Sequence, residues 1–232
     1  MRKPLVCLFL ALGLTSCGNG GILEPTQIAA VRVYNGSPDS PPLSILLRGS
    51  AIAASLQYGF GRFYSYFNAG SAPIQVQNAA GDILLDYPAT IAGGVSYTFA
   101  VTGYVASLKP VFLTDDTTAA ASGNFKIRMV HLAPLGPALD LYITGPTDDI
   151  TTATPAVTGL TFTNASAYVS STAGSVRFRI TATGDKTVLR EVGTFTLNSG
   201  QGVTLLFIGN AGAGGGGAPY SSQLVADHNG TT

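Results

Sequence analysis

One stretch of this sequence occurs twice, and that repetition constrains the fold more than any other feature. Residues 31–47 read VRVYNGSPDSPPLSILL, and residues 127–143 read IRMVHLAPLGPALDLYI, 96 positions later. The two stretches align without gaps, with Val31 opposite Ile127 and Arg32 opposite Arg128. Similarity continues in the same order over about 95 residues. A period of that length predicts two whole domains, because solenoid repeats are only about 20–50 residues long.

A polar segment separates the two copies. Residues 114–124 read TDDTTAAASGN, a composition typical of an interdomain linker. We therefore expect a first repeat over residues 28–118 and a second over residues 119–232. We also expect residues 24–118 and 122–232 to behave as separate folding units.

Each copy consists of short alternating segments. AVRVY places Val31 and Val33 on one face and Arg32 on the other, and VRFRI at 176–180 has the same period. Turn clusters such as NGSPDSPP separate these segments. About seven strands per copy predict an all-β protein of two tandem immunoglobulin-like antiparallel β-sandwiches. The Trp of antibody domains is absent, so only the general architecture is implied.

The N-terminus has the pattern of an export signal. Arg2 and Lys3 precede the apolar run PLVCLFLALG, which is too short to span a bilayer. LTSC, ending at Cys17, resembles a bacterial lipobox, which implies a signal peptide over 1–16, a lipid on Cys17 and a tether over 17–27. The alternative is an ordinary secretory signal with an incidental cysteine. Gly18, where Asp often retains lipoproteins in the inner membrane, favours the outer membrane of a Gram-negative host.

The repeated motif also carries a family resemblance. A hydrophobic-Arg-hydrophobic strand, a Pro-containing turn and then Pro-x-Leu-Asp-Leu-Tyr resemble the DUF4397 family, and IRMVHLAPLGPALDLYITG is the closer copy. The first copy departs from the pattern, with Asn35 for His and Ser44 for Asp. The resemblance spans most of residues 28–228. It implies export or lipid anchoring and tandem copies, and it carries no catalytic residues.

Composition argues against several classes of site. A formal charge of +0 gives no basic surface for nucleic acid. Two His and no free Cys in the mature chain cannot form a usual zinc site. The acidic pairs Asp115-Asp116 and Asp148-Asp149 are expected in solvated turns, with a calcium contact as the alternative. GAGGGG at 212–217 matches a dinucleotide motif formally, but no helix pattern follows, so a hairpin loop is expected. We predict no metal and no cofactor.

One pair of residues offers a catalytic alternative. His131 and Asp140 lie nine positions apart in the repeated motif, and an envelope hydrolase could use both. No Gly-x-Ser-x-Gly elbow accompanies them. The preferred interpretation is structural: His131 closes a strand and bonds a turn, Asp140 caps a turn, and Asn35 and Ser44 do the same in the first copy.

One stretch differs between the copies and supplies a candidate binding face. In YGFGRFYSYF at 58–67, a regular strand places Phe63 and Phe67 toward the core. The opposite face would then carry the candidate binding residues Tyr58, Phe60, Arg62, Tyr64 and Tyr66. The second copy, LTFTNASAYV, keeps only Phe162 and Tyr168 of this stripe. An exposed aromatic row can bind an envelope protein or a glycan, and the alternative is packing against the second domain or under a loop.

These observations predict a lipid-anchored protein of the bacterial cell envelope with a binding or structural role and no catalysis. Its expected partners are the membrane, through the lipid, and an envelope protein or glycan.

Overall fold

The protein was analysed as a computed structural model that describes residues 27–209 and 220–230. Cys17 and the glycine-rich stretch 212–217 lie outside the described residues. Within the described part, the chain forms β-strands and one short 3-10 turn, η2 (Val105–Ser107), and no α-helix. The predicted all-β class is therefore confirmed. No helix in this part of the chain is long and apolar enough to cross a membrane.

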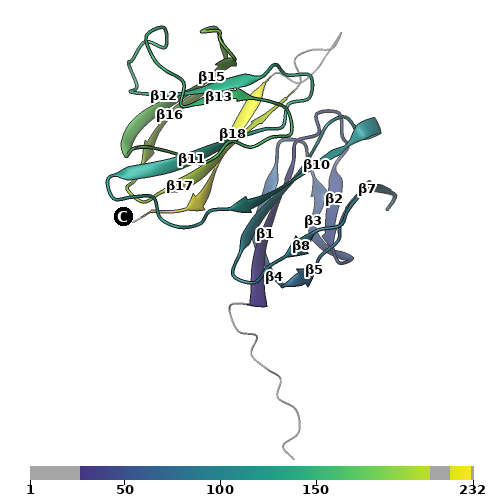
Figure 1. Ribbon diagram of the computed structural model, residues 1–232. Coiled ribbons are helices and arrows are strands. Elements are labelled where there is room, and N and C mark those ends of the chain that lie inside the picture. The colour runs from purple at the N-terminus through teal and green to yellow at the C-terminus, as the bar shows by residue number, and fades with distance from the viewer. Residues whose placement is uncertain (1–26, 210–219, 231–232) are drawn as a thin grey trace, which may run out of the picture.

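The N-terminal half, residues 28–115, contains two four-stranded sheets (Figure 1). The first has the order β10-β9-β1-β4 and is made of β10 (Lys109–Asp115), β9 (Ser96–Thr102), β1 (Ile28–Asn35) and β4 (Gly61–Asn68). The second has the order β3-β2-β6-β7 and is made of β3 (Ser50–Leu56), β2 (Leu43–Leu47), β6 (Ile74–Gln77) and β7 (Ile83–Tyr87). A small ribbon joins β5 (Gly70–Ser71) to β8 (Thr90–Ile91).

The C-terminal half, residues 124–228, also contains two four-stranded sheets. The first has the order β14-β11-β17-β18 and is made of β14 (Val169–Thr172), β11 (Asn124–His131), β17 (Gly202–Ile208) and β18 (Ser221–His228). The second has the order β13-β12-β15-β16 and is made of β13 (Val157–Leu160), β12 (Leu139–Thr144), β15 (Gly174–Ala182) and β16 (Val188–Leu197).

The two halves have the same strand order, strand for strand. β1, β4, β9 and β10 occupy the places of β11, β14, β17 and β18. In each half the first strand pairs in parallel with the second-last strand: β1 with β9, and β11 with β17. The repeated sequence is thus matched by repeated topology.

The sheets are not purely antiparallel as predicted, and their strand order differs from that of an immunoglobulin constant domain. In an immunoglobulin constant domain the first two strands are neighbours in one antiparallel sheet. Here β1 and β2 lie in different sheets, and each half contains one parallel pair. Alternating sequence patterns indicate which face of a strand is buried. They carry no information about which strand lies beside which, so the sequence implied only the general architecture.

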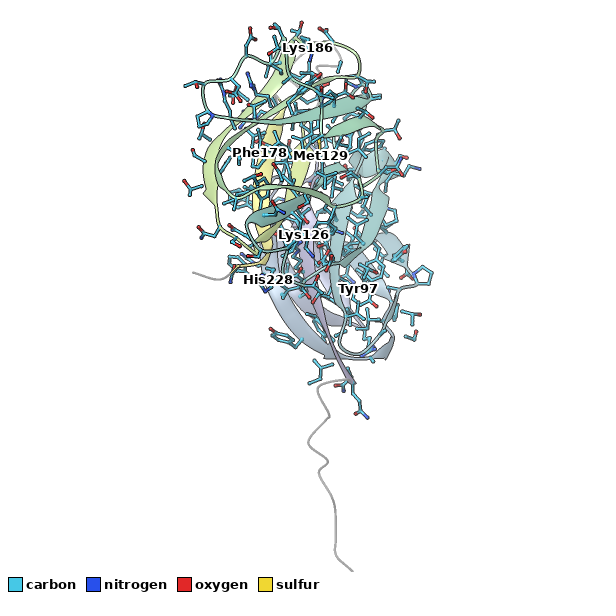
Figure 2. The ribbon with its side chains drawn as sticks, turned by 60° about the vertical axis from the view of Figure 1, so that its left-hand side comes forward. Tyr97, Lys126, Met129, Phe178, Lys186 and His228 are labelled. Carbon is cyan, nitrogen blue, oxygen red and sulfur yellow. The ribbon has the colours of Figure 1, made fainter. Side chains whose placement is uncertain are left out.

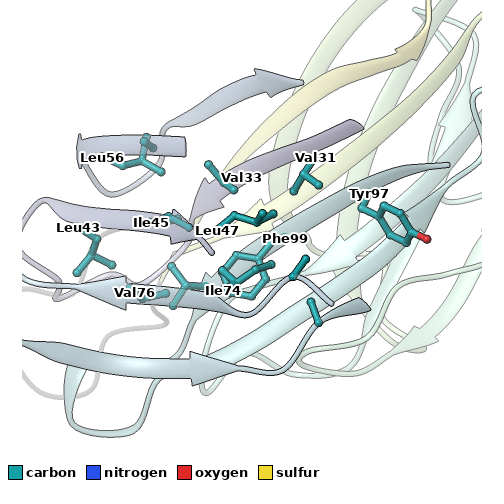
Figure 3. Packing of buried hydrophobic residues seen from close by; sticks show 14 of the residues in the cluster. Val31, Val33, Leu43, Ile45, Leu47, Leu56, Ile74, Val76, Tyr97 and Phe99 are labelled. Carbon is teal, nitrogen blue, oxygen red and sulfur yellow. The ribbon is translucent and has the colours of Figure 1, made fainter. Parts of the chain in front are cut away.

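Each half has its own apolar core between its two sheets. In the N-terminal half, Val31 and Val33 of β1 meet Ile45 and Leu47 of β2, all at most 1% exposed (Figure 3). In the C-terminal half, Met129 and Phe178 are fully buried, and Figure 2 shows both inside that half. Burying one such side chain contributes about 1.5–3 kcal/mol. The predicted inward direction of Val31, Val33, Val176, Phe178 and Ile180 is confirmed.

A third apolar cluster lies between the halves. Tyr34 and Ala100 come from the N-terminal half, and Val130, Leu132 and Leu206 from the C-terminal half. These residues lie on strands of the β10-β9-β1-β4 sheet and the β14-β11-β17-β18 sheet, or directly after such a strand. The two sheets therefore pack against each other through the faces that point away from their own cores. The strands of the first half end at Asp115, and those of the second begin at Asn124.

Candidate binding groove between the halves

Arg32 of β1 extends from the N-terminal half into the C-terminal half. Its Nη2 donates to the Asp227 carboxylate of β18, and its Nη1 donates to the Ala226 carbonyl oxygen at 2.9 Å. Its Nε donates to Thr98 Oγ1 on the neighbouring strand at 2.7 Å. The side chain is only 2% exposed, so a buried charge is matched by a charge and by two further acceptors.

Arg128 of β11 makes the same contacts in the opposite direction. Its Nη2 donates to the Asp115 carboxylate of β10, and its Nη1 donates to the Thr114 carbonyl oxygen at 2.9 Å. Its Nε donates to Thr204 Oγ1 at 2.9 Å. Each half therefore supplies an arginine to the other half and receives one.

A tyrosine completes each ion pair. Tyr64 Oη of β4 donates to Asp115 Oδ2 at 2.6 Å, and Tyr168 Oη donates to Asp227 Oδ2 at 2.8 Å. The Arg32 guanidinium also lies 4.8 Å from the centre of the Tyr64 ring, within cation–π distance. Burial, followed by the negative charge of Asp115, raises the pKa of Tyr64 well above its ordinary value. Tyr64 therefore remains a neutral hydrogen-bond donor.

One expectation about these residues needs correction. Asp115 was predicted in a solvated turn, but it ends β10 and its side chain is fully buried. Asp116 does lie in the connection between the two halves, and its carboxylate pairs with Lys126 at 2.5 Å. The hydrogen bonds from Lys126 and Thr118 lower the pKa of Asp116 to about 2. Arg32 does face away from its own core as predicted, but toward the other half.

The sequence carries a signal for this network that the motif analysis missed. The last strand of each copy has an aspartate at its last or second-last position, in VFLTD at 111–115 and QLVAD at 223–227. Aspartate is unfavourable inside strands, so its recurrence at one place in both copies indicates a specific partner. The hydrophobic-Arg-hydrophobic strand in each copy supplies that partner.

A β-bulge in β4 interrupts the alternation on which the candidate aromatic face was based. Val31 and Val33 of β1 are two residues apart, yet they pair with Ser65 and Arg62, which are three apart. The extra residue in β4 interrupts the alternation between inward and outward side chains. Phe67 packs against the core as predicted, but the prediction for Phe63 is wrong, because its side chain is 93% exposed.

The bulge divides the predicted face into three environments. Tyr58 packs against the apolar cluster between the halves, and Tyr66 is 74% exposed further along β4. Phe60, Arg62 and Tyr64 line a groove together with Phe63. The strand register also makes Tyr168 the equivalent of Tyr64 in the second repeat, since Ser65 pairs with Val31 as Val169 pairs with Ile127.

The groove lies between β4 of one half and β18 of the other. Its volume is about 590 Å³, within the usual range of ligand-binding pockets. One wall is formed by the aromatic residues around β4 and the other by residues 223–227 of β18, with Arg32 and Tyr34 in the lining as well. Gly61 makes room for Tyr34, because a Cβ at position 61 would come within 2.1 Å of the Tyr34 ring.

Several polar side chains in the groove have no hydrogen-bond or ion-pair partner among the described residues. Arg62, Gln223 and Asn229 line it or its end, and none forms a hydrogen bond or ion pair with another described residue. Phe60 and Phe63 are 60% and 93% exposed. The groove thus combines exposed rings with free donors and acceptors, which is the composition of a recognition site.

The catalytic alternative finds no support in the geometry of His131 and Asp140. His131 is fully buried; its Nδ1 accepts from the Ala133 N–H at 3.3 Å, and its Nε2 lies 3.0 Å from the Pro137 carbonyl oxygen. Burial lowers the pKa of His131, and the Pro137 bond offsets only part of that. Asp140 accepts from the N–H groups of Gly159 and Gly184. No hydrogen bond joins the two side chains, so each has the structural role preferred for it.

The remaining candidates lie in ordinary turns. Asn35 accepts from the Ser37 N–H at 3.0 Å, as His131 does from Ala133, which confirms the predicted equivalence for this pair but not for Ser44 with Asp140. Asp148 and Asp149 accept from the N–H groups of Gly145 and Thr151. Among the described residues, no group of three or more His, Cys, Asp or Glu is placed to hold a metal ion.

Comparison with known proteins gives one family-model match, over about half of the chain. Residues 29–142 match the model of the domain of unknown function DUF4397. The match supports the resemblance seen in the repeated motif, and it spans β1 to β10 and continues through β11 into β12. No curated protein matches the sequence.

Two solved structures show a remote similarity. One is a product complex of the multi-modular glycogen-degrading pneumococcal virulence factor SpuA, with a TM-score of 0.27 and 10% identity over 76% of this chain. This chain spans 20% of the length of that one. The other is a candidate cell adhesion protein from Bacteroides eggerthii DSM 20697, with a TM-score of 0.22 and 12% identity over 89% of this chain and 97% of that one.

Proposed function

We propose that this chain is a lipid-anchored protein of the bacterial cell envelope that acts without catalysis, by binding a partner in the groove between β4 and β18. The lipobox-like LTSC sequence supports the anchor at Cys17, and the matched family supports export. The second repeat is proposed as a second copy of the same family domain. The groove carries the binding proposal, because exposed rings and uncommitted polar groups converge in one concave site.

The start of β1 and the groove lie at different ends of the N-terminal half. β1 begins at Ile28, and Figure 1 places that end of β1 away from the C-terminal half. The groove lies where the two halves meet. A lipid at Cys17, joined through the predicted tether, would therefore leave the groove open to a partner in the envelope.

Clustering of exposed apolar side chains supports a binding role. Six large hydrophobic side chains are exposed in the described part of the chain, and Phe60, Phe63 and Tyr66 among them lie in or next to β4. Scattered single exposed residues are normal, but neighbouring exposed aromatics mark interaction sites. The corresponding strand β14 reads VSST and has no aromatic residue. The proposed site therefore belongs to one side of a pseudo-symmetric pair.

The proposal is tested by removing the two exposed rings of the groove. The mature chain, made lipid-free by Cys17→Ser, is titrated onto washed envelope fractions, with and without Phe60→Ser and Phe63→Ser. Loss of the two rings should weaken saturable binding by about thirtyfold or more, since a single interface anchor already contributes about 2 kcal/mol or more. The control is Ile83→Ser, which removes a side chain that is 54% exposed on β7. Unchanged binding by the double variant would exclude the groove.

A further inference from the structure

We propose that the occupant of the groove is an extended peptide segment of another envelope protein, which adds a strand to the free edge of β18. This inference rests on the proposed function, because it names the class of partner for the same groove. The segment would carry apolar side chains for Phe60 and Phe63 and an acidic side chain for Arg62.

The first argument is that β18 is an edge strand. It pairs with β17 on one side and with no described strand on the other. The Ala226 carbonyl accepts a hydrogen bond from Arg32, so the backbone groups of Ala226 point toward the unpaired side. In a strand, backbone groups of residues two apart point to the same edge. Pairing is regular from Leu224 to Ala226, so Leu224 also presents its N–H and C=O to this edge.

The second argument is that this edge forms a wall of the groove. Residues 223–227 line the groove as one continuous segment, opposite the aromatic residues of β4. Near the start of β18, Arg190 Nε of β16 donates to Ser222 Oγ at 3.2 Å. The part of this edge that lines the groove together with Phe60 and Phe63 is residues 223–227. Strand addition at such an edge gives affinity through backbone hydrogen bonds and specificity through alternate side chains.

The third argument concerns charge. Arg32 and Asp227 are already paired in the groove wall, whereas Arg62 is exposed and has no acidic partner among the described residues. The groove therefore has one unneutralised positive charge next to two exposed rings. An extended segment with alternating apolar residues and one acidic residue complements both features.

A glycan is the competing occupant, since it too stacks on aromatic rings. The Leu224 N–H and C=O and the Ala226 N–H on the outer edge of β18 favour the peptide, because they repeat at the spacing of a partner strand, while the Ala226 carbonyl is already bound by Arg32. The two occupants give opposite results when the backbone donors of β18 are removed, so one experiment separates them.

The test uses a display library of random dodecapeptides selected on the Cys17→Ser chain. Selected peptides should lose binding at least tenfold to Ala226→Pro, which removes a donor on the free edge and leaves the ladder with β17 intact. The control is Thr114→Pro on β10, at the equivalent place next to Asp115, whose carbonyl is bound by Arg128. Peptides that bind wild type, Ala226→Pro and Thr114→Pro equally would overturn the proposal.

A second measurement does not depend on the folding of a variant. A selected peptide is resynthesised with N-methyl groups at alternate positions, which blocks strand pairing and keeps the side chains. We expect at least a tenfold loss of binding, and slower amide exchange at Leu224 and Ala226 when the unmethylated peptide is bound. Undiminished binding of the methylated peptide would overturn the proposal of a peptide occupant. So would the failure to select any peptide, if cell-wall glycan fragments instead bind at Phe63. In either case the groove would remain a binding site.

Discussion

Arg32 and Asp227 lie 195 residues apart in sequence, yet the guanidinium of one donates to the carboxylate of the other across the boundary between the two halves. Arg128 and Asp115 form the reciprocal pair. Each arginine comes from the strand that opens a repeat, and each aspartate comes from the strand that closes one. The repeated motif therefore encodes the contact between the copies as well as the fold of each copy.

The first prediction concerns the stability of this contact. Asp227→Ala should lower the free energy of unfolding by about 3–5 kcal/mol, because it leaves the Arg32 charge buried without its partner. Urea denaturation measures this value. The control is Glu191→Ala, which removes an exposed pair with Arg177 and should cost far less, because solvent screens that pair. Equal, small losses in both variants would show that the buried pair contributes little.

A second prediction concerns how the halves hold together. The expectation that each half folds alone stays a prediction, but the apolar cluster and the ion pairs between the halves should keep them associated after the connection is cut. A protease site placed within residues 117–122 and then cleaved should leave one particle in gel filtration. Cleaved Asp115→Ala with Asp227→Ala should separate into two. Separation of the cleaved wild type would contradict a stable interface.

A third prediction concerns acid stability. The pKa of His131 lies below its ordinary value of 6.5 because of burial, so the unfolded chain takes up this proton first as the pH falls. The free energy of unfolding should therefore decrease as the pH falls below about 6.5. Above that pH, His131 should cause no such loss of stability. His131→Asn, which introduces the residue of the first copy, should flatten the wild-type profile between pH 6.5 and 5. Parallel profiles for the two proteins would exclude His131 as the source.

A fourth prediction concerns the anchor. Cys17→Ala should abolish labelling by radioactive fatty acid and release from the signal peptide by the lipoprotein route. The control is Cys7→Ala, which lies inside the predicted signal peptide and should leave labelling of the mature chain unchanged. Labelling that persists in Cys17→Ala would show that the lipobox interpretation is wrong.

A fifth prediction separates two tyrosines that the sequence pattern treated alike. Tyr64 bonds to Asp115 within the network, whereas Tyr66 is 74% exposed. Tyr64→Phe should lower stability by about 1.5–3 kcal/mol, typical of a hydrogen bond to a charged group. Tyr66→Phe should change it by less than about 0.5 kcal/mol. Thermal unfolding of both variants makes the comparison, and equal losses would argue against the network.

Particular residues show how far the sequence predicts this fold. The inward faces at Val31, Val33 and Phe178 followed from alternation alone, because burial on one face of a strand has a period of two. Strand order did not follow, because pairing of β1 with β9 depends on contacts 66 residues apart, such as Arg32 with Thr98. Phe63 was misassigned because one extra residue in β4 breaks the period.

The candidate site was predicted in part for the same reason. Phe60, Arg62 and Tyr64 were recognised because this stretch differs between the copies, and they do line the groove. Its other wall, residues 223–227, comes from the far end of the chain, and no local pattern indicates that it meets β4. Asp115 and Asp227 were missed because an aspartate at a strand end resembles a turn residue until its partner is known.

Photo-crosslinking from position 63 in intact cells tests the binding groove most directly. A photoreactive phenylalanine analogue replaces Phe63, and in matched strains it replaces Ala167, the exposed residue that the register places at the same position of the second repeat, or Ile83 on β7. The account predicts a discrete crosslinked envelope product from position 63 that is absent from positions 83 and 167. No product from position 63, or the same products from all three positions, would contradict a partner bound in the groove between β4 and β18.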